Sequence, residues 1–202
     1  MQDNLSKQAF WKECYTTNQL TWDIGSSTPF LVDFLQNNQF LRNKRICVLG
    51  CGMGHDVVEF AKYGNEVHAI DFVDDAINHL IQIKDSENYN IIPKLMDIFD
   101  LNKVYNSYFD VVYEYTCYCA IPLEKRADYR KIVYDILCDK GMYIGILFPV
   151  GKKKSDGGPP FGVNIENTKE KFMKYFKLIS CEDNPVSIDR RLDQEKVIVL
   201  KK

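Results

Sequence analysis

Short apolar runs alternate with amphipathic stretches along this chain, and the alternation predicts a β-sheet with helices on both faces. Strands buried in a parallel sheet are apolar throughout, whereas helices carry apolar residues at three- and four-residue spacing. Apolar runs cover residues 46–49, 66–70, 90–95, 109–114, 142–149, 176–181 and 196–200. Helical spacing covers residues 5–15, 29–41, 57–61, 74–84, 123–138 and 167–175. We therefore expect an α/β fold with one doubly wound, mostly parallel, seven-stranded sheet.

Three local features of the pattern make further predictions. Pro93 in the third run suits a strand at the edge of the sheet or the first residues of a strand, because proline donates no backbone hydrogen bond. The helix over residues 123–138 is expected to end at Asp139-Lys140-Gly141, with Gly141 supplying the turn. Asn167 is expected to cap the helix that follows the long polar loop of residues 151–161.

The first apolar run leads directly into Gly50-Cys51-Gly52-Met53-Gly54, and a helical pattern follows. Glycine tolerates positive φ and has no Cβ, so a ligand can lie against the backbone of such a turn. The turn stands at the carboxyl end of a predicted parallel strand, which is where open α/β sheets bind nucleotides. The alternative is a tight turn with a structural purpose only.

Two nucleotide ligands fit a glycine turn of this kind. A dinucleotide site has the pattern G-x-G-x-x-G, and its third glycine falls on His55 here. Asp56 opens the next helix, where a carboxylate repels phosphate but can accept a hydrogen bond from an ammonium group. We therefore favour a ligand with an amino-acid end and no phosphate, such as S-adenosylmethionine. An NAD-dependent oxidoreductase is the competing hypothesis.

Acidic residues follow the second and third predicted strands. Asp71 ends the second strand, where a carboxylate accepts hydrogen bonds from both ribose hydroxyls of either cofactor. Asp97 follows the third strand, where its carboxylate can accept from an adenine amine while Ile98 packs on the ring. A helix cap or a turn is the structural alternative for Asp97.

Composition narrows the class of protein. The 202 residues are 46% hydrophobic and 27% charged with a net charge of -2, which suits one globular domain and argues against a nucleic-acid or membrane-surface partner. The seven cysteines do not form a disulfide framework or a zinc pattern, so we expect reduced cysteines and no metal. The sequence shows neither a signal peptide nor an apolar stretch long enough to span a bilayer, which favours a cytoplasmic protein.

The motifs together resemble the thiopurine methyltransferase family. This is a branch of the class I S-adenosylmethionine-dependent methyltransferases that includes halide, thiol and metalloid methyltransferases. The resemblance extends over nearly the whole chain. It rests on Phe10-Trp11, the Thr21-Trp22-Asp23-Ile24-Gly25 loop, the glycine turn with His55-Asp56, Asp97-Ile98-Phe99, the segments Tyr115-Thr116 and Cys119-Ala120-Ile121-Pro122, Arg126, and Gly158-Pro159-Pro160-Phe161. It implies a Rossmann-like class I fold in a single domain over residues 1–202, with an N-terminal aromatic lid and helices in 1–40 and the core in 41–202.

The resemblance also implies a role for individual residues. The expected cofactor-binding residues are Trp11, Tyr15, Trp22, Gly50, Gly52, Asp71, Asp97, Ile98 and Tyr115. Trp22, Tyr118, Arg126, Pro160 and Phe161 are expected to contact the substrate. Leu49 replaces a proline common before the glycine turn, and Leu123-Glu124-Lys125-Arg126 replaces a common Pro-Glu-x-Arg run.

The chemistry implied is methyl transfer from S-adenosylmethionine to a small soft nucleophile, which leaves S-adenosylhomocysteine. The acceptor is a thiol, sulfide, thiopurine, halide or metalloid. Such nucleophiles need orientation and a dry cavity more than a strong base. Arg126 and the hydroxyl of Tyr115 or Tyr118 are the candidates for favouring the anion, with Asp23 as a proton acceptor. The alternative function is a non-catalytic module that binds the cofactor or its product. We expect the protein to be a monomer.

Overall fold

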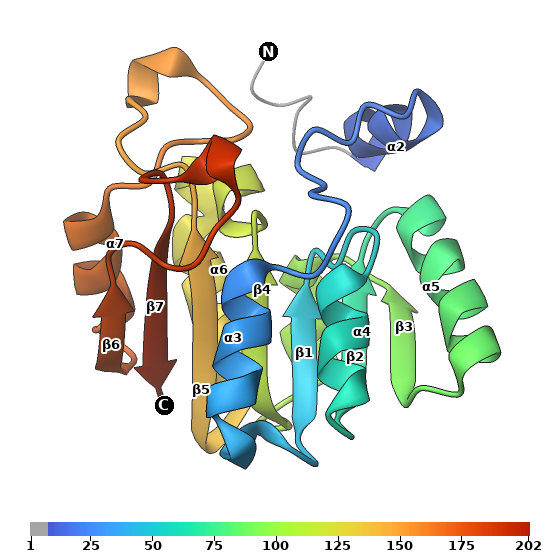
Figure 1. Ribbon diagram of the computed structural model, residues 1–202. Helices are drawn as coiled ribbons and strands as arrows, with labels where there is room; N and C mark the ends of the chain where they lie inside the picture. The colour runs from blue at the N-terminus through green and yellow to red at the C-terminus, as the bar shows by residue number, and fades with distance from the viewer. Residues whose placement is uncertain (1–7) are drawn as a thin grey trace.

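The computed structural model describes residues 8–202 and contains one seven-stranded sheet (Figure 1). Its strand order is β3-β2-β1-β4-β5-β7-β6. The strands are β1 (Arg45–Leu49), β2 (Glu66–Asp71), β3 (Ile91–Leu95), β4 (Phe109–Tyr115), β5 (Leu137–Leu147), β6 (Lys177–Glu182) and β7 (Lys196–Lys201). Only β7 pairs antiparallel with its neighbours β5 and β6. The expected mostly parallel sheet is confirmed.

Six helices and several short 3-10 turns connect these strands within the described residues. The helices are α2 (Gln8–Thr16), α3 (Pro29–Asn37), α4 (His55–Lys62), α5 (Asp74–Glu87), α6 (Arg126–Ile136) and α7 (Ile165–Phe172). The turns used below are η2 (Ile98–Lys103), η3 (Tyr118–Ala120) and η6 (Asp189–Arg191). Residues 5–7 of the first predicted helix lie outside the described part. Within residues 8–202, no helix combines the length and the apolar character that crossing a membrane requires.

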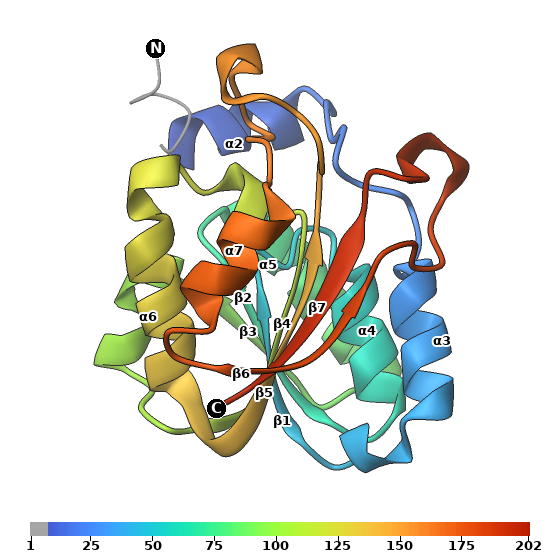
Figure 2. The same cartoon turned by 90° about the vertical axis from the view of Figure 1, so that its left-hand side faces the viewer.

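The two faces of the sheet carry separate apolar cores because side chains alternate along each strand. Ile46 and Val48 of β1 face the core shared with α3, α4 and α5. Cys47 and Leu49 face the core shared with η2, α6 and α7. Figure 2 shows α3 and α4 on one side of the strands and α6 and α7 on the other. Strands that are apolar throughout, rather than alternating, are the result of this double coverage.

The predicted helix over residues 123–138 is wrong at its carboxyl end. α6 ends at Ile136, and Leu137 already pairs with Phe109 as part of β5. The β4–β5 register then shifts, so that Val111 pairs with Met142. Lys140, not Gly141, takes the positive φ, at 65°. Gly141 is small for another reason, since a Cβ there would lie 3.1 Å from the Phe109 carbonyl oxygen.

The polar loop after β5 also ends differently from the prediction. α7 begins at Ile165, and its cap is Asn164, whose side chain accepts from the Asn167 backbone N–H at 2.9 Å. Asn167 therefore lies inside the first turn of α7, and its prediction as the cap was wrong. The prediction for Pro93 is confirmed, because β3 is an edge strand and pairs only with β2.

The order of the strands places a crevice above β1 and β4. The chain builds β2 and β3 on one side of β1 and then returns to place β4 on the other side. The connections leaving β1 and β4 therefore diverge, and open α/β sheets bind ligands at such a point. In Figure 1, α2 lies beyond the carboxyl ends of the parallel strands, on the side of the sheet that carries β3 and α5.

Candidate active site

The three glycines after β1 have positive φ angles but face different surroundings. The φ angles of Gly50, Gly52 and Gly54 are 59°, 54° and 80°. Gly50 and Gly52 line a cavity of about 500 Å³. A Cβ on Gly54 would instead lie 2.3 Å from Cδ2 of Leu80, a buried residue of α5. Gly50 and Gly52 therefore shape this cavity, and Gly54, which does not line it, packs against a residue of the core.

The N-terminal aromatic residues cover this pocket. Trp11 and Trp22 meet edge to face, with ring centroids 5.2 Å apart, and Tyr15 packs against Trp22 at 5.8 Å. Trp11, Tyr15 and Trp22 all line the 500 Å³ cavity. A Cβ on Gly52 would lie 3.7 Å from the Tyr15 hydroxyl and 3.8 Å from Trp22 Nε1. The aromatic lid expected from the sequence thus lies directly over the glycine turn.

Two polar contacts hold α2 in this position. Gln8 Nε2 donates to the Phe72 carbonyl at 2.5 Å, and Lys12 Nζ donates to Asp74 Oδ2 at 2.7 Å. No residue of α2 is buried. The helix is therefore attached by these polar contacts and by the half-buried packing of Trp11 and Tyr15 on Trp22, without any fully buried side chain.

Asp71 lines the pocket from the end of β2. Its side chain is 7% exposed, and its two carboxylate oxygens accept from the backbone N–H groups of Gly52 and Val73, both at 3.0 Å. Burial raises the pKa of this carboxyl, and the two backbone donors oppose the rise. Each oxygen keeps a further lone pair, so Asp71 can still accept hydrogen bonds from a ligand.

Asp97 and Ile98 line the same pocket beside Asp71. Asp97 Oδ1 accepts from the Phe99 backbone N–H at 2.9 Å and so caps η2. The helix-cap alternative is therefore also present, and the second carboxylate oxygen is left for other partners. Lys125 lies over the Phe99 ring at 5.3 Å and adds a cation to this wall.

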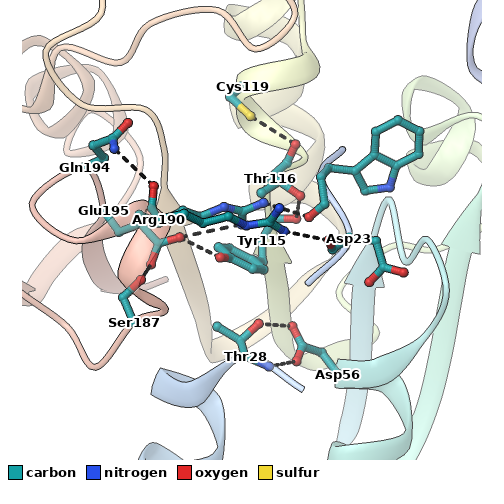
Figure 3. Close-up of polar contacts among 12 residues, drawn as sticks. Asp23, Thr28, Asp56, Tyr115, Thr116, Cys119, Ser187, Arg190, Gln194 and Glu195 are labelled. Atoms are coloured by element: carbon teal, nitrogen blue, oxygen red, sulfur yellow. Dashed lines mark hydrogen bonds and ion pairs between the residues drawn. The ribbon is translucent and has the colours of Figure 1, made fainter. Parts of the chain in front are cut away.

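Asp56 does not fit the ammonium-binding role that its position suggested. Its carboxylate accepts from the Thr28 backbone N–H at 2.7 Å and from Thr28 Oγ1 at 2.6 Å (Figure 3). It also accepts from the Tyr113 hydroxyl at 2.8 Å. Burial raises its pKa, and these donors oppose the rise. The protein itself uses this carboxylate to join α3, α4 and β4.

Asp23 and Tyr115 lie beside the main pocket rather than in its lining. Both border a second cavity of about 60 Å³, which shares Gly50, Gly52 and Trp22 with the first. Asp23 Oδ1 accepts from the Gly25 N–H at 2.9 Å and lies 3.1 Å from His55 Nε2. The Tyr115 hydroxyl donates to Glu195 Oε1 at 2.6 Å.

Three of the expected substrate-binding residues do not line either cavity. Arg126 is 7% exposed, and its guanidinium donates to the carbonyls of Ile121, Phe161 and Gly162 at 3.2 to 3.3 Å. Tyr118 and Phe161 are buried. Pro160 does line the main pocket. Arg126 thus joins the wall around Ile121 to the loop that carries Pro160.

A buried carboxylate supports the turn that follows β4. Glu114 Oε2 accepts from the backbone N–H groups of Cys117 and Tyr118 at 3.1 and 2.9 Å, and Oε1 accepts from the Tyr143 hydroxyl at 3.2 Å. Complete burial raises the pKa of this carboxyl to about 7. Cys117 and Cys119 of this turn line the pocket.

The sequence reasoning missed an arginine pair that lines the pocket. Arg190 and Arg191 belong to η6. The Arg190 guanidinium donates to the Asp23 carbonyl at 2.7 Å (Figure 3), and the Arg191 guanidinium donates to the Trp22 carbonyl at 2.7 Å. Arg191 is 3% exposed, and its guanidinium lies 4.9 Å from the Tyr115 ring and 4.8 Å from the Phe148 ring. Among residues 8–202, its Nη1 finds no hydrogen-bond partner. Two arginines in a loop are typical of a solvated segment, so only the fold reveals them.

Comparison with known proteins agrees with this geometry. The family model of thiopurine S-methyltransferases matches residues 6–201. Thiocyanate methyltransferase 1 of Brassica oleracea is 32% identical over 195 residues, covering 93% of this chain and 82% of that protein. A thiopurine S-methyltransferase of Acinetobacter baylyi is 26% identical over 187 residues, covering 84% of this chain and 85% of that protein.

Solved structures with lower sequence identity share the fold. The 1,6-didemethyltoxoflavin-N1-methyltransferase of Burkholderia thailandensis, solved with S-adenosylhomocysteine, superposes with a TM-score of 0.78 at 14% identity. The alignment covers 96% of this chain and 86% of that one. TehB of Haemophilus influenzae gives a TM-score of 0.68 at 18% identity, with coverage of 95% and 67%. The Rossmann-like fold of class I methyltransferases is therefore confirmed.

Proposed function

We propose, given that this chain belongs to the thiopurine S-methyltransferase family, that its methyl acceptor is a small soft anion such as thiocyanate or a thiolate. The protein is a methyltransferase that uses S-adenosylmethionine and acts on a small soft nucleophile. The observation that carries the choice of an anion is the positive charge of the pocket lining, to which Arg191, Arg190 and Lys125 contribute.

The residues of the pocket fit the methyl donor. The glycine turn leaves an open floor, since a Cβ on Gly50 would lie 3.0 Å from Cys117 Sγ and would narrow it. We assign Gly50 and Gly52 to the methionyl part, Asp71 to the ribose hydroxyls, and Asp97 with Ile98 to the adenine. Trp11, Tyr15 and Trp22 cover the donor and exclude water. The donor supplies an electrophilic methyl group on a sulfonium.

The remaining residues orient the acceptor. A soft anion needs no strong base, because it is nucleophilic once it is bound and partly desolvated. Arg191 favours the anion electrostatically, and Phe148 and Pro160 provide apolar walls beside it. We assign Arg126, Tyr115 and Asp23 to positioning, because their polar groups already contact the protein. Tyr118 and Phe161 are buried behind the residues that line the pocket and support the part of the wall that faces the acceptor.

A panel of acceptors tests this proposal through release of S-adenosylhomocysteine. The panel contains thiocyanate, hydrosulfide, methanethiol, iodide, a neutral thiopurine, and tellurite. We expect the highest kcat/KM with one of the anions. No turnover with any acceptor of the panel, together with tight binding of S-adenosylhomocysteine, would instead support a non-catalytic module that binds the cofactor.

The variant Arg191→Met distinguishes a preference for anionic acceptors from a general loss of activity. Arg191→Met removes the charge and keeps an apolar side chain that can pack between the two rings. We expect kcat/KM for the anion to fall about tenfold more than kcat/KM for the neutral thiopurine, because a hydrogen bond to a charged group contributes about 1.5–3 kcal/mol. Equal losses for both acceptors would contradict the anion site.

We further propose that residues 1–202 form one domain that acts as a monomer in the cytoplasm. The single sheet joins both apolar cores and supports this view. Light scattering on the purified protein tests the monomer, since a mass of about 23.5 kDa is expected.

A further inference from the structure

The connection between β6 and β7 contains a buried carboxylate that the proposed reaction leaves without a role. Glu195 is 2% exposed and directly precedes β7. Its Oε1 accepts from the Tyr115 hydroxyl at 2.6 Å, and its Oε2 accepts from Ser187 Oγ at 2.5 Å (Figure 3). A buried carboxylate needs both donors and an opposite charge to offset its loss of hydration.

Arg191 supplies that opposite charge. Its Nη1 lies 3.7 Å from Glu195 Oε1, beyond hydrogen-bond distance but close enough for strong attraction where water is excluded. Both side chains are at least 96% buried, and Glu195 is the ion-pair partner that Arg191 finds within residues 8–202. The guanidinium is fixed further by the rings of Tyr115 and Phe148.

Arg191 in turn contacts the aromatic lid. Its Nη2 donates to the Trp22 carbonyl at 2.7 Å, across 169 positions of sequence. Trp22 contacts both Trp11 and Tyr15. A chain of contacts thus runs from Ser187 and Tyr115 through Glu195 and Arg191 to the aromatic lid.

We propose that Glu195 is a positioning residue whose charge holds Arg191 against the Trp22 carbonyl and so keeps the aromatic lid over the glycine turn. Glu195 itself lines neither cavity, so it acts through its contacts with Arg191 and Tyr115. Without the carboxylate, Arg191 is a buried cation with no counter-charge. It then moves toward water in the pocket and releases Trp22. The proposal rests on the proposed function only for its effect on turnover.

Tryptophan fluorescence tests the proposal without any ligand. The chain has two tryptophans, both in the lid, so Trp11→Phe leaves Trp22 as the single fluorophore. In this background we compare Glu195→Gln with Asp183→Asn. Glutamine keeps the size and the hydrogen-bonding capacity of Glu195 but removes its charge. Asp183 is an exposed carboxylate of the same connection that pairs with Lys196 at 2.8 Å, and its loss controls for the local change of charge.

We expect acrylamide quenching of Trp22 to rise at least about twofold in Glu195→Gln and to stay unchanged in Asp183→Asn, because only the first leaves a buried charge unpaired. Turnover with the best acceptor is expected to fall about tenfold in the first variant, since misplaced active-site groups cost rate. Unchanged quenching in Glu195→Gln would overturn the proposal. If the wild type turns over no acceptor, the proposed function fails, and the quenching still decides about Glu195.

A double variant separates positioning from lost stability. Glu195→Gln with Arg191→Met removes both charges, so its melting temperature is expected to recover toward that of the wild type. Its quenching is expected to stay as high as in Glu195→Gln, because the donor to the Trp22 carbonyl is absent. Quenching that returns to the wild-type value together with stability would show a merely structural role and contradict the proposal.

Discussion

At the scale of single residues, carboxylates placed near the ends of neighbouring strands serve different purposes. Asp71 ends β2, Asp56 lies in the first turn of α4 after β1, and burial raises the pKa of both carboxyls. Asp71 lines the pocket and accepts only two backbone donors. Asp56 accepts three donors from Thr28 and Tyr113 and is committed to the scaffold. The sequence showed where each acid lies but not which neighbours would use it.

Replacing Asp71 tests its proposed contact with the ribose. We expect Asp71→Asn to weaken binding of S-adenosylhomocysteine at least about tenfold, since a charged hydrogen bond contributes about 1.5–3 kcal/mol. Isothermal titration calorimetry measures the affinity. Asp75→Asn on the exposed side of α5 is the matched control and should bind as the wild type does. An unchanged affinity in Asp71→Asn would place the ribose elsewhere.

Glu114 gives the protein a pH-dependent stability term. Its pKa rises from 4.5 in the unfolded chain to about 7 in the folded protein. The folded state therefore holds a proton that the unfolded chain has released between these values. This contribution is fully present below pH 4.5, decreases as the pH rises toward 7, and is lost above it.

The variant Glu114→Gln removes this titration. Relative to the wild type, we expect it to gain stability as the pH rises through that window, by up to about 1.4 kcal/mol for each pH unit. Urea unfolding at a series of pH values measures the difference. Glu124→Gln, at an exposed position before α6, should show no such trend. A flat difference for Glu114→Gln would mean that the carboxyl is ionised throughout.

At the scale of elements, the glycine turn was predictable, but it was not predictable which of its glycines line the pocket and which packs against the core. The sequence pattern treats Gly50, Gly52 and Gly54 alike. Only the structure shows that Leu80 of α5 occupies the space beside Gly54. In the same way, the helical spacing of residues 123–138 continues into β5, because Leu137 suits a buried helix face and a buried strand equally.

Alanine at two of these glycines is expected to give opposite results. Gly54→Ala places a Cβ 2.3 Å from Leu80 Cδ2, so we expect it to lower stability by about 2–4 kcal/mol through strain and overpacking. Gly52→Ala meets no protein atom closer than 3.7 Å and should lose only about 1 kcal/mol of stability, but it should weaken cofactor binding strongly. Thermal unfolding and calorimetry measure the two effects. Equal loss of stability in both variants would contradict this division.

At the scale of the whole molecule, the lid is an attachment to an independently packed sheet. Removing residues 1–18 deletes α2, which contains no buried residue, together with Trp11 and Tyr15. We expect the melting temperature to fall by less than about 5 °C, because surface ion pairs contribute little. The stabilisation that S-adenosylhomocysteine gives the full chain should largely disappear. A large drop in melting temperature without ligand would show that the lid belongs to the core.

Much of the fold was predictable because strands that helices cover on both faces are apolar throughout, and such apolar runs are visible in the sequence. The seven strands, Pro93 at the edge and the glycine turn all follow from local pattern. The acceptor side was not predictable, because Arg191 and Glu195 reach the lid only through the return of β7 into the sheet. Arg126 had the expected position in sequence, but its guanidinium is used by three backbone carbonyls.

The place of β7 in the sheet has a consequence for biosynthesis. β7 is translated after every other strand, yet it lies between β5 and β6. While the ribosome makes residues 148–195, β5 has an open edge and β6 has no partner, so the nascent chain exposes strands prone to aggregation. Glu195 is placed only when β7 closes the gap. The lid is therefore secured in the last step of folding, and an incomplete chain should be a client for chaperones before it can retain a methyl donor.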